Sequence, residues 1–274
     1  MSAFDLELAA RALAPKDMLN QASSMRLAMH IGEGLVEATI ADVASSNIVW
    51  SEVFKQDIFE DLQTQIDFIQ DRNWSERVFR KCSLTFDSRC FTLVPAPFFT
   101  ESESHRLLAY NTGREIQFVD HVYLPGADAY LVFEVPGSIK TLVKKFPNVR
   151  ILPSVFLLAL NAESNIQRRD QQIQMYVGKN YMLLCVHLSG KLQLLNYFEV
   201  QSETDVLYFL SNAVMRAVMD PEDLILEYAD SFGFTGLEKM LKAYYSNVTN
   251  QLTALNIRNA ESFSFFTSLQ IKCV

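Results

Sequence analysis

The chain has 274 residues, of which 49% are apolar and 20% charged, and a formal net charge of −8 at pH 7. This composition is typical of a globular protein, and the length allows one large domain or two smaller ones, each with its own core. The acidic balance and the scarcity of basic pairs such as Arg80-Lys81 exclude nucleic-acid binding as an expected function.

Cysteine spacing and hydropathy indicate a cytoplasmic protein. No C-x-x-C spacing and no histidine at ligand spacing accompany the cysteines, so no structural zinc is expected. Free thiols suit a reducing compartment. The first 22 residues carry charges where a signal peptide would be apolar, and no apolar run approaches the ~18 residues of a membrane span. The four cysteines are Cys82, Cys90, Cys185 and Cys273.

Residues 1–24 are interpreted as an N-terminal extension. Phe4, Leu8 and Ala12 recur at helical spacing ahead of Pro15. Such an amphipathic helix could dock a partner protein or cap the protein's own sheet, and we favour the second interpretation.

The next stretch, residues 25–164, is predicted to form the first of two similar halves. Alternating apolar residues and tight turns up to residue 54 predict three antiparallel strands, and helical spacing then begins at Phe59. A piece at about 81–123 is interpreted as an insertion that holds a hairpin and a helix. The remaining predicted elements are hairpin strands at 82–86 and 90–94, strands at 128–135 and 149–152, and helices at 102–111, 137–146 and 154–161.

The same order of elements returns in the predicted second half, residues 165–274. Three more strands lead to a helix that Ser202 opens with a capping-box pattern, and a further strand and helix follow. An internal duplication explains this order economically, although two unrelated β-meanders could also look alike. A polar linker is expected at 161–170, and the aromatic tail near 263–271 either packs back or binds a partner. The alignment of the two copies puts Gly32 on Gly178, Leu35 on Tyr181 and Phe54 on Phe198.

The predicted order is three meandering strands, a helix and then alternating strand and helix, and it is present twice. This order resembles that of the actin, heat-shock-70 and sugar-kinase superfamily. More closely, the chain is similar to an uncharacterised bacterial family of about this length with an actin-like ATPase fold. The resemblance implies an α/β chain with a duplicated actin-like, ribonuclease-H-like fold, in which helices flank two mixed β-sheets. The strings that carry it are 82–94 with Pro95, 128–136, 146–148, and 190–199 leading into the Ser202 helix.

The resemblance also implies a phosphate cleft between the halves, with an Asp-x-Gly pattern at each hairpin turn. The aspartate organises Mg²⁺ through water, and the glycine lets backbone amides approach the phosphates. Here His30 and Tyr176 stand at the aspartate positions, and Leu152 stands where a third polar residue is usual. No catalytic residue and no metal site are therefore expected, and ATP with Mg²⁺ is a disfavoured cofactor. The residues of a possible ligand cleft are Gly32, Glu33, Gly34, Gly178, Lys179, Asn180, Ser231 and Gly233.

The sequence supports the fold better than any function. The favoured hypothesis is a non-catalytic scaffold or interaction protein with a degenerate actin-like fold and an unknown protein partner. The alternative is a sensor or ATPase that binds a nucleotide or phosphorylated ligand in a divergent cleft. A third is a chain without a ligand that dimerises through a sheet edge, so the choice between monomer and homodimer stays open.

Overall fold

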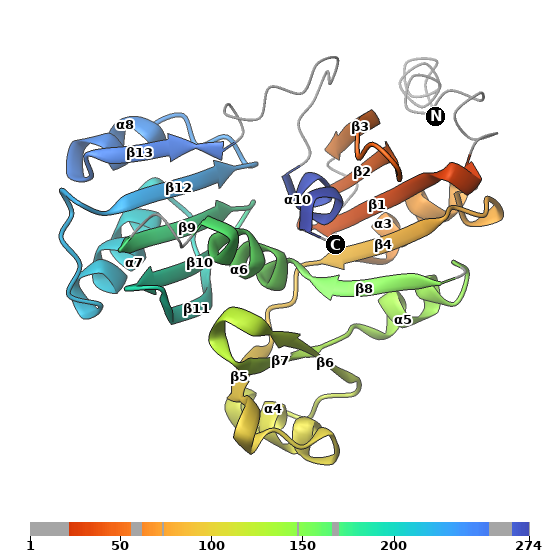
Figure 1. Cartoon of the computed structure of the whole chain (residues 1–274), viewed down its shortest axis with the longest axis horizontal. Coiled ribbons are helices and arrows are strands. Elements are labelled where there is room, and N and C mark those ends of the chain that lie inside the picture. Colours follow the sequence, from red (N-terminus) through yellow and green to blue (C-terminus); the bar gives the residue numbers. More distant parts are fainter. Residues whose placement is uncertain are drawn as a thin grey trace.

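The computed structural model describes residues 22–55, 62–72, 74–146, 148–165, 170–251 and 265–273. Two five-stranded sheets stand side by side, and a small three-stranded sheet lies below them in the view of Figure 1. The helix predicted in the N-terminal extension lies outside the described residues. The mixed α/β architecture with two mixed sheets confirms the predicted fold class.

The first large sheet has the strand order β3-β2-β1-β4-β8. The first three strands form an antiparallel meander, whereas β4 and β8 run parallel to β1, as crossover helices require. Its elements are β1 (Met25–Gly32), β2 (Leu35–Asp42), β3 (Ile48–Lys55), β4 (Lys81–Phe86) and β8 (Val149–Pro153), with the helices α3 (Leu62–Asp71), α5 (Gly137–Val143) and α6 (Ser154–Asn165).

The second large sheet repeats this order as β11-β10-β9-β12-β13. Its pairing reproduces the predicted register, because Phe54 lies opposite Val36 in one meander and Phe198 opposite Met182 in the other. The repeated order supports an internal duplication. The elements are β9 (Gln171–Val177), β10 (Tyr181–Leu188), β11 (Lys191–Glu199), β12 (Ile225–Asp230) and β13 (Asn247–Asn250), with the helices α7 (Glu203–Arg216), α8 (Leu237–Tyr244) and α10 (Phe265–Cys273).

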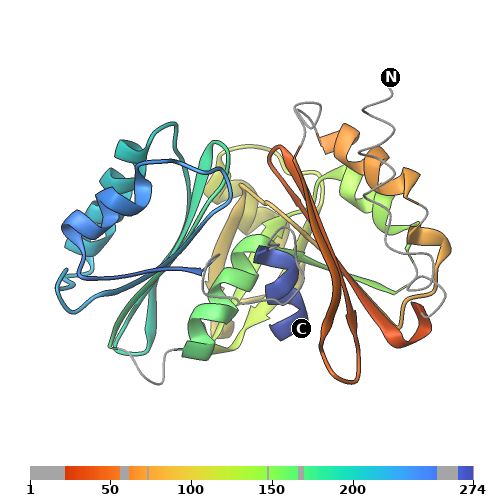
Figure 2. The same ribbon diagram turned by 90° about the horizontal axis from the view of Figure 1, so that it is seen from above.

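The last helix of each repeat packs on the sheet of the other repeat. Helix α6 contacts β9 and β10, and α10 contacts β1 and β2. The two helices lie against each other between the sheets, as Figure 2 shows. One hydrophobic core therefore runs from the first sheet through these helices into the second sheet, and a separate core lies between the second sheet and α7 and α8. The described part of the aromatic tail, from residue 265 onward, packs back onto the protein, since Phe265 and Phe266 are buried.

The predicted hairpin of residues 82–86 and 90–94 is wrong. Strand β4 is a central strand of the first sheet, buried along almost its whole length between β1 and β8. The strand that follows it pairs with β7 in the small sheet, which has the order β5-β7-β6 and is covered on one side by a helix. These elements are β5 (Phe91–Pro95), β6 (Val119–Leu124), β7 (Ala129–Glu134) and α4 (Ser104–Thr112).

Two local predictions can be compared with single elements. The capping box at the start of α7 is confirmed, because the Ser202 side chain accepts from the Asp205 backbone amide and the Asp205 carboxylate accepts from the Ser202 amide. The linker prediction is wrong for residues 161–165, which belong to α6, whose buried apolar residues continue its helical pattern. Short 3₁₀ helices cover Ala22–Ser24, Trp74–Glu76, Ala96–Phe98, Glu101–Glu103 and Pro125–Ala127.

No helix among the described residues is both long enough and apolar enough to cross a membrane.

Candidate functional site

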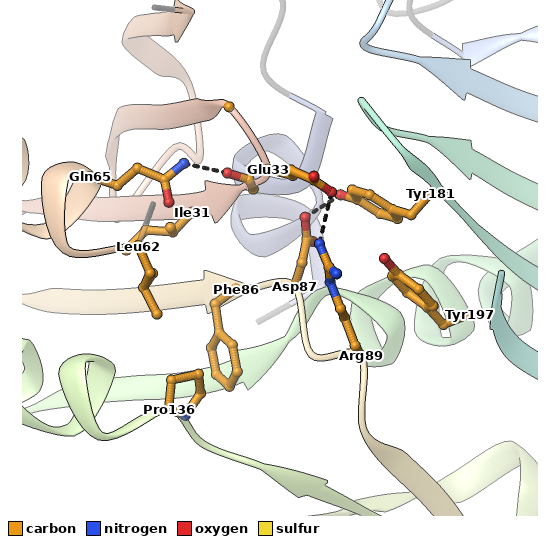
Figure 3. A pocket seen from close by; sticks show the side chains of 12 residues that line it. Ile31, Glu33, Leu62, Gln65, Phe86, Asp87, Arg89, Pro136, Tyr181 and Tyr197 are labelled. Carbon is orange, nitrogen blue, oxygen red and sulfur yellow. Dashed lines mark hydrogen bonds and ion pairs between the residues drawn. The ribbon is translucent and has the colours of Figure 1, made fainter. Parts of the chain in front are cut away.

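A cavity of about 190 Å³ lies where the two halves meet, beside the first hairpin turn. Figure 3 shows its side chains, which come from the β1–β2 turn, α3, the end of β4 and the second sheet. It lies at the place where a possible ligand cleft was expected from the sequence, and it is called the cleft below. The lining residues are Ile31, Gly32, Glu33, Gly34, Leu62, Gln65, Phe86, Asp87, Arg89, Pro136, Tyr181 and Tyr197.

A side chain of α3 binds the backbone of the first hairpin turn. Gly32 pairs with Leu35, so Glu33 and Gly34 form a two-residue turn, in which Gly34 has a φ of 74° that favours glycine. The buried Gln65 amide donates to the carbonyl oxygens of Gly32, at 2.5 Å, and Leu35, at 3.2 Å. The turn is thereby fixed by a side chain that no sequence pattern pointed to.

Glu33 joins the two halves across the mouth of the cleft. Its carboxylate accepts a hydrogen bond from the Asn180 amide of the second hairpin turn at 2.8 Å, and it forms an ion pair with Arg89 at 3.0 Å. The aliphatic part of Lys179 lies close to Gly34. The two hairpin turns therefore contact each other directly.

Asp87 is the centre of the polar contacts inside the cleft. It follows β4 directly, and its Oδ1 accepts from Ser154 Oγ at 2.5 Å and lies 3.2 Å from His30 Nε2. Its Oδ2 accepts from the Tyr181 hydroxyl of the second sheet. Both oxygens of this nearly buried carboxylate are thus occupied by protein groups.

His30 lies fully buried between two carboxylates. Its Nδ1 is 3.5 Å from Glu37 Oε2, which is an ion-pair distance rather than a good hydrogen bond. Glu37 also accepts from the backbone amides of Phe266 and Thr267, at 3.2 Å and 3.4 Å. These amides belong to the first turn of α10, where the helix dipole favours negative charge. A chain of contacts therefore runs from α10 through Glu37 and His30 to Asp87.

The charges of this chain shift the pKa of its members. Burial alone would lower the pKa of His30, but the negative charge of Asp87, the hydrogen bond with Asp87 and the nearby Glu37 carboxylate outweigh it and raise the pKa to about 9. Burial alone would raise the pKa of Asp87, but the His30 charge and three hydrogen bonds lower it. Burial is the largest cause that raises the pKa of the Tyr181 hydroxyl, and the negative charge of Asp87 is the second. The His30 side chain is therefore an imidazolium between the carboxylates of Asp87 and Glu37. The Tyr181 hydroxyl is a neutral hydrogen-bond donor to Asp87.

This arrangement predicts how stability depends on pH. His30 has a folded pKa above its ordinary 6.5, so its contribution is complete below 6.5 and is lost as the pH rises through about 9. We expect the free energy of unfolding, measured by urea denaturation, to fall across that window. His30→Gln, which cannot titrate, should flatten the curve there. A wild-type stability that is constant or rises between these values would contradict a protonated His30.

The structure brings some of the predicted cleft residues together and separates others. Gly32, Glu33 and Gly34 line the cavity, and Asn180 reaches it by its bond to Glu33. Gly178 pairs with Tyr181, and a Cβ at Gly178 would collide with the Tyr181 ring. Lys179 adjoins Gly34, while Ser231 binds the Tyr176 hydroxyl and Gly233 belongs to a turn around Asp230. Neither Ser231 nor Gly233 lines the cavity.

One carboxylate of the cleft, that of Glu33, was expected from the sequence, and a second, that of Asp87, was missed. The aspartates of the Asp-x-Gly patterns are indeed replaced, but Asp87 and Glu33 both line the cavity. Asp87 escaped the sequence analysis because it comes from the neighbouring strand rather than from the hairpin. A usable signal was its position, since ligand sites of open α/β sheets lie beyond the carboxyl ends of the strands.

These carboxylates do not form an evident metal site. Within the ranges that the structure describes, no group of three or more His, Cys, Asp and Glu side chains could hold a metal ion. Asp87 has His30, Ser154 and Tyr181 on its oxygens, and Glu33 has Asn180 and Arg89. The carboxylates of Asp87 and Glu33 are therefore both bound by other groups of the protein.

Two five-stranded sheets with the same order, and a cleft between their hairpin turns, define an actin-like fold. A Bacteroides thetaiotaomicron protein described as having an actin-like ATPase fold and unknown function is similar at a TM-score of 0.79 and 17% identity, over 93% of this chain and 98% of that one. A chain of the PilM–PilN type IV pilus biogenesis complex is similar at 0.59 and 10% identity, over 91% and 98%. Residues 15–248 match the family described as protein of unknown function DUF3822, and the chain belongs to that family. No curated protein matches the sequence.

Proposed function

We propose that this chain is a non-catalytic interaction protein whose actin-like cleft is closed by its own side chains. The observation that carries the proposal is the bond from the Tyr181 hydroxyl, in the second half, to Asp87, in the first. A nucleotide and its metal would have to break this bond, because it occupies the carboxylate that points into the cleft.

Space and charge support the same conclusion. The cavity holds about 190 Å³, whereas pockets for organic ligands usually measure about 300–1,000 Å³. Its lining carries two carboxylates, Glu33 and Asp87, and the guanidinium of Arg89 is already paired with Glu33. Phosphates would meet negative charge here, while phosphoryl transfer needs positive charge and metal ions around the transferred group.

A role in an assembly is supported by exposed apolar side chains and by one relative. Phe98 and Tyr110 are largely exposed on the part of the chain that carries the small sheet, and Tyr208 and Met215 on α7. Aromatic and methionine side chains are enriched at protein interfaces. The similar chain from the PilM–PilN type IV pilus biogenesis complex belongs to an assembly, so this fold is compatible with a role as an assembly component.

Nucleotide titration tests the proposal. We expect no heat of binding and no thermal shift when the full chain is titrated with ATP or ADP at millimolar concentration, with and without Mg²⁺. Micromolar, Mg²⁺-dependent binding that Arg89→Ala weakens would overturn the closed cleft and favour a nucleotide sensor. A cooperative thermal unfolding transition of the same sample shows that the protein is folded.

A further inference from the structure

A second cavity, of about 230 Å³, lies at the opposite end of the first sheet from the cleft. The cleft adjoins Gly32 and Phe86, at the carboxyl ends of β1 and β4, whereas this cavity adjoins the beginnings of β1, β4 and β8. The residues that line it are Arg26, Arg80, Lys81, Cys82, Ser83, Asn148, Arg150 and Gln270.

The charge of this lining is opposite to that of the whole chain. Four cationic side chains line the cavity, those of Arg26, Arg80, Lys81 and Arg150, and no acidic residue does. In the described part of the chain, none of the four forms an ion pair with a carboxylate. A protein with a net charge of −8 thus carries four cationic side chains in one concave site, and none of them has an ion pair within the described ranges.

Strand register explains why these side chains converge. Arg26 lies opposite Lys81, and Ser83 lies opposite Arg150. Lys81 and Ser83 are two residues apart in one strand, so their side chains point to the same face of the sheet. The side chains of their pairing partners, Arg26 and Arg150, point to that face as well. Three of the four cations, Arg26, Lys81 and Arg150, are therefore brought together by pairing within the sheet, and Arg80 directly precedes β4.

Helix α10 forms one wall of the cavity and holds part of it in place. The Ser83 hydroxyl donates to the Gln270 side chain, whose amide donates to the Met29 carbonyl oxygen at 2.8 Å. Arg26 Nη1 donates to the Ile271 carbonyl oxygen at 3.0 Å, near the end of α10. The guanidinium of Arg26 is consequently positioned before any ligand arrives, which lowers the entropic cost of binding.

The remaining groups suit an anion as well. Burial raises the pKa of Cys82 to about 12, so its thiol adds no negative charge. Guanidinium groups present several N–H donors in a plane and match the oxygens of phosphate in bidentate pairs. Asn148, whose φ is 56°, forms a turn at the rim and adds an amide.

We propose that this cavity is a binding site for a compact phosphate-bearing anion, either inorganic phosphate or a small phosphomonoester. A phosphomonoester carries a charge of about −1.5 to −2 at pH 7 and three acceptor oxygens, which the four cations can meet. The cavity, at about 230 Å³, is small for a drug-sized ligand, for which about 300–1,000 Å³ is usual. The site is separate from the cleft between the halves and does not depend on whether that cleft binds anything.

The test titrates the full chain with inorganic phosphate and with glycerol 3-phosphate by calorimetry, at constant ionic strength, with acetate as the control anion. We expect saturable binding of at least one phosphate compound and a rise in melting temperature by linkage. Arg80→Ala and Arg150→Ala change exposed side chains and should each weaken binding about tenfold, as expected for the loss of a charge-assisted contact. Arg106→Ala, on α4 outside the cavity, is the matched control and should bind as the wild type does.

The outcomes separate the site from the cleft. Absence of saturable phosphate binding, or binding that Arg80→Ala and Arg150→Ala leave unchanged, would overturn the proposal. An equal loss in Arg106→Ala would show unspecific attraction to charge and would overturn it too. If ATP binds and loses affinity in Arg80→Ala but not in Arg89→Ala, its phosphates enter the basic cavity, and the closed cleft stands.

Discussion

Replacing Asp87 by alanine is expected to lower the free energy of unfolding by about 3–5 kcal/mol, the usual cost of removing one partner of a buried ion pair. The substitution leaves His30 buried beside a single carboxylate, and it takes the acceptor from Ser154 and from Tyr181. Urea denaturation followed by fluorescence measures the loss. Because Asp87 is the main cause that raises the pKa of His30, we also expect that pKa to fall in the variant, as read from the imidazole proton shifts.

Graded variants separate this network from a general effect of lost charge. Tyr181→Phe keeps the buried ring but removes the hydroxyl, so it should cost about 1–3 kcal/mol through the acceptor that it leaves without a partner. Asp223→Ala removes an exposed carboxylate, and such surface changes usually stay within about 0.5 kcal/mol. If Asp87→Ala were no more destabilising than Asp223→Ala, Asp87 would not hold the two halves together.

The meander strands were predictable because their signals are local. The tight turn at Gly34 separates two strands that are buried on both faces, as in sheets covered on two sides, and the turn at Gly190 separates β10 from the partly exposed β11. The repeat then fixed the register, with Phe54 and Phe198 at equivalent pairs. Helical spacing and the Ser202 capping box marked α7 in the same way, since both are set within a few residues of sequence.

The hairpin error shows where local signals fail. Residues 82–86 and 90–94 are separated by three residues, which favours a hairpin, but β4 pairs in parallel with β1 and β8 over long distances in sequence. The burial of nearly all of β4 is typical of a central strand, but its sequence alternates apolar residues with Ser83 and Thr85, a pattern that also fits a half-exposed hairpin strand.

The cleft was predictable in position but not in content. The glycines located the first turn, because a backbone conformation such as that of Gly34 favours this residue. Asp87, Gln65 and Tyr181 contact that turn or one another from elements far away in the sequence, so no spacing rule connects them. A search for the Asp-x-Gly pattern examines one strand and its hairpin turn. It does not find a carboxylate such as that of Asp87, which follows the adjacent strand.

Helix α10 packs against the charge network of Glu37, His30 and Asp87. Phe266 is fully buried, with its ring centroid 4.6 Å from that of His30 and 4.4 Å from that of Tyr176. Its backbone amide binds Glu37, so the position of the ring also sets the distance between the start of α10 and this carboxylate. A cavity at this residue would therefore weaken both the packing and the charge network.

Phe266→Ala is accordingly expected to lower the free energy of unfolding by about 3–5 kcal/mol, from lost burial and the cavity that remains. Ser268→Ala in the same helix is the matched control, because the Ser268 hydroxyl has no hydrogen-bond partner among the described residues, and its removal should be neutral or stabilising. Urea denaturation of both variants gives the comparison. Hydrogen exchange adds a local measure: amides of β1 and β2 should lose protection in Phe266→Ala, because α10 covers these strands. A loss below about 1 kcal/mol with unchanged protection would mean that α10 does not pack on the first sheet as described.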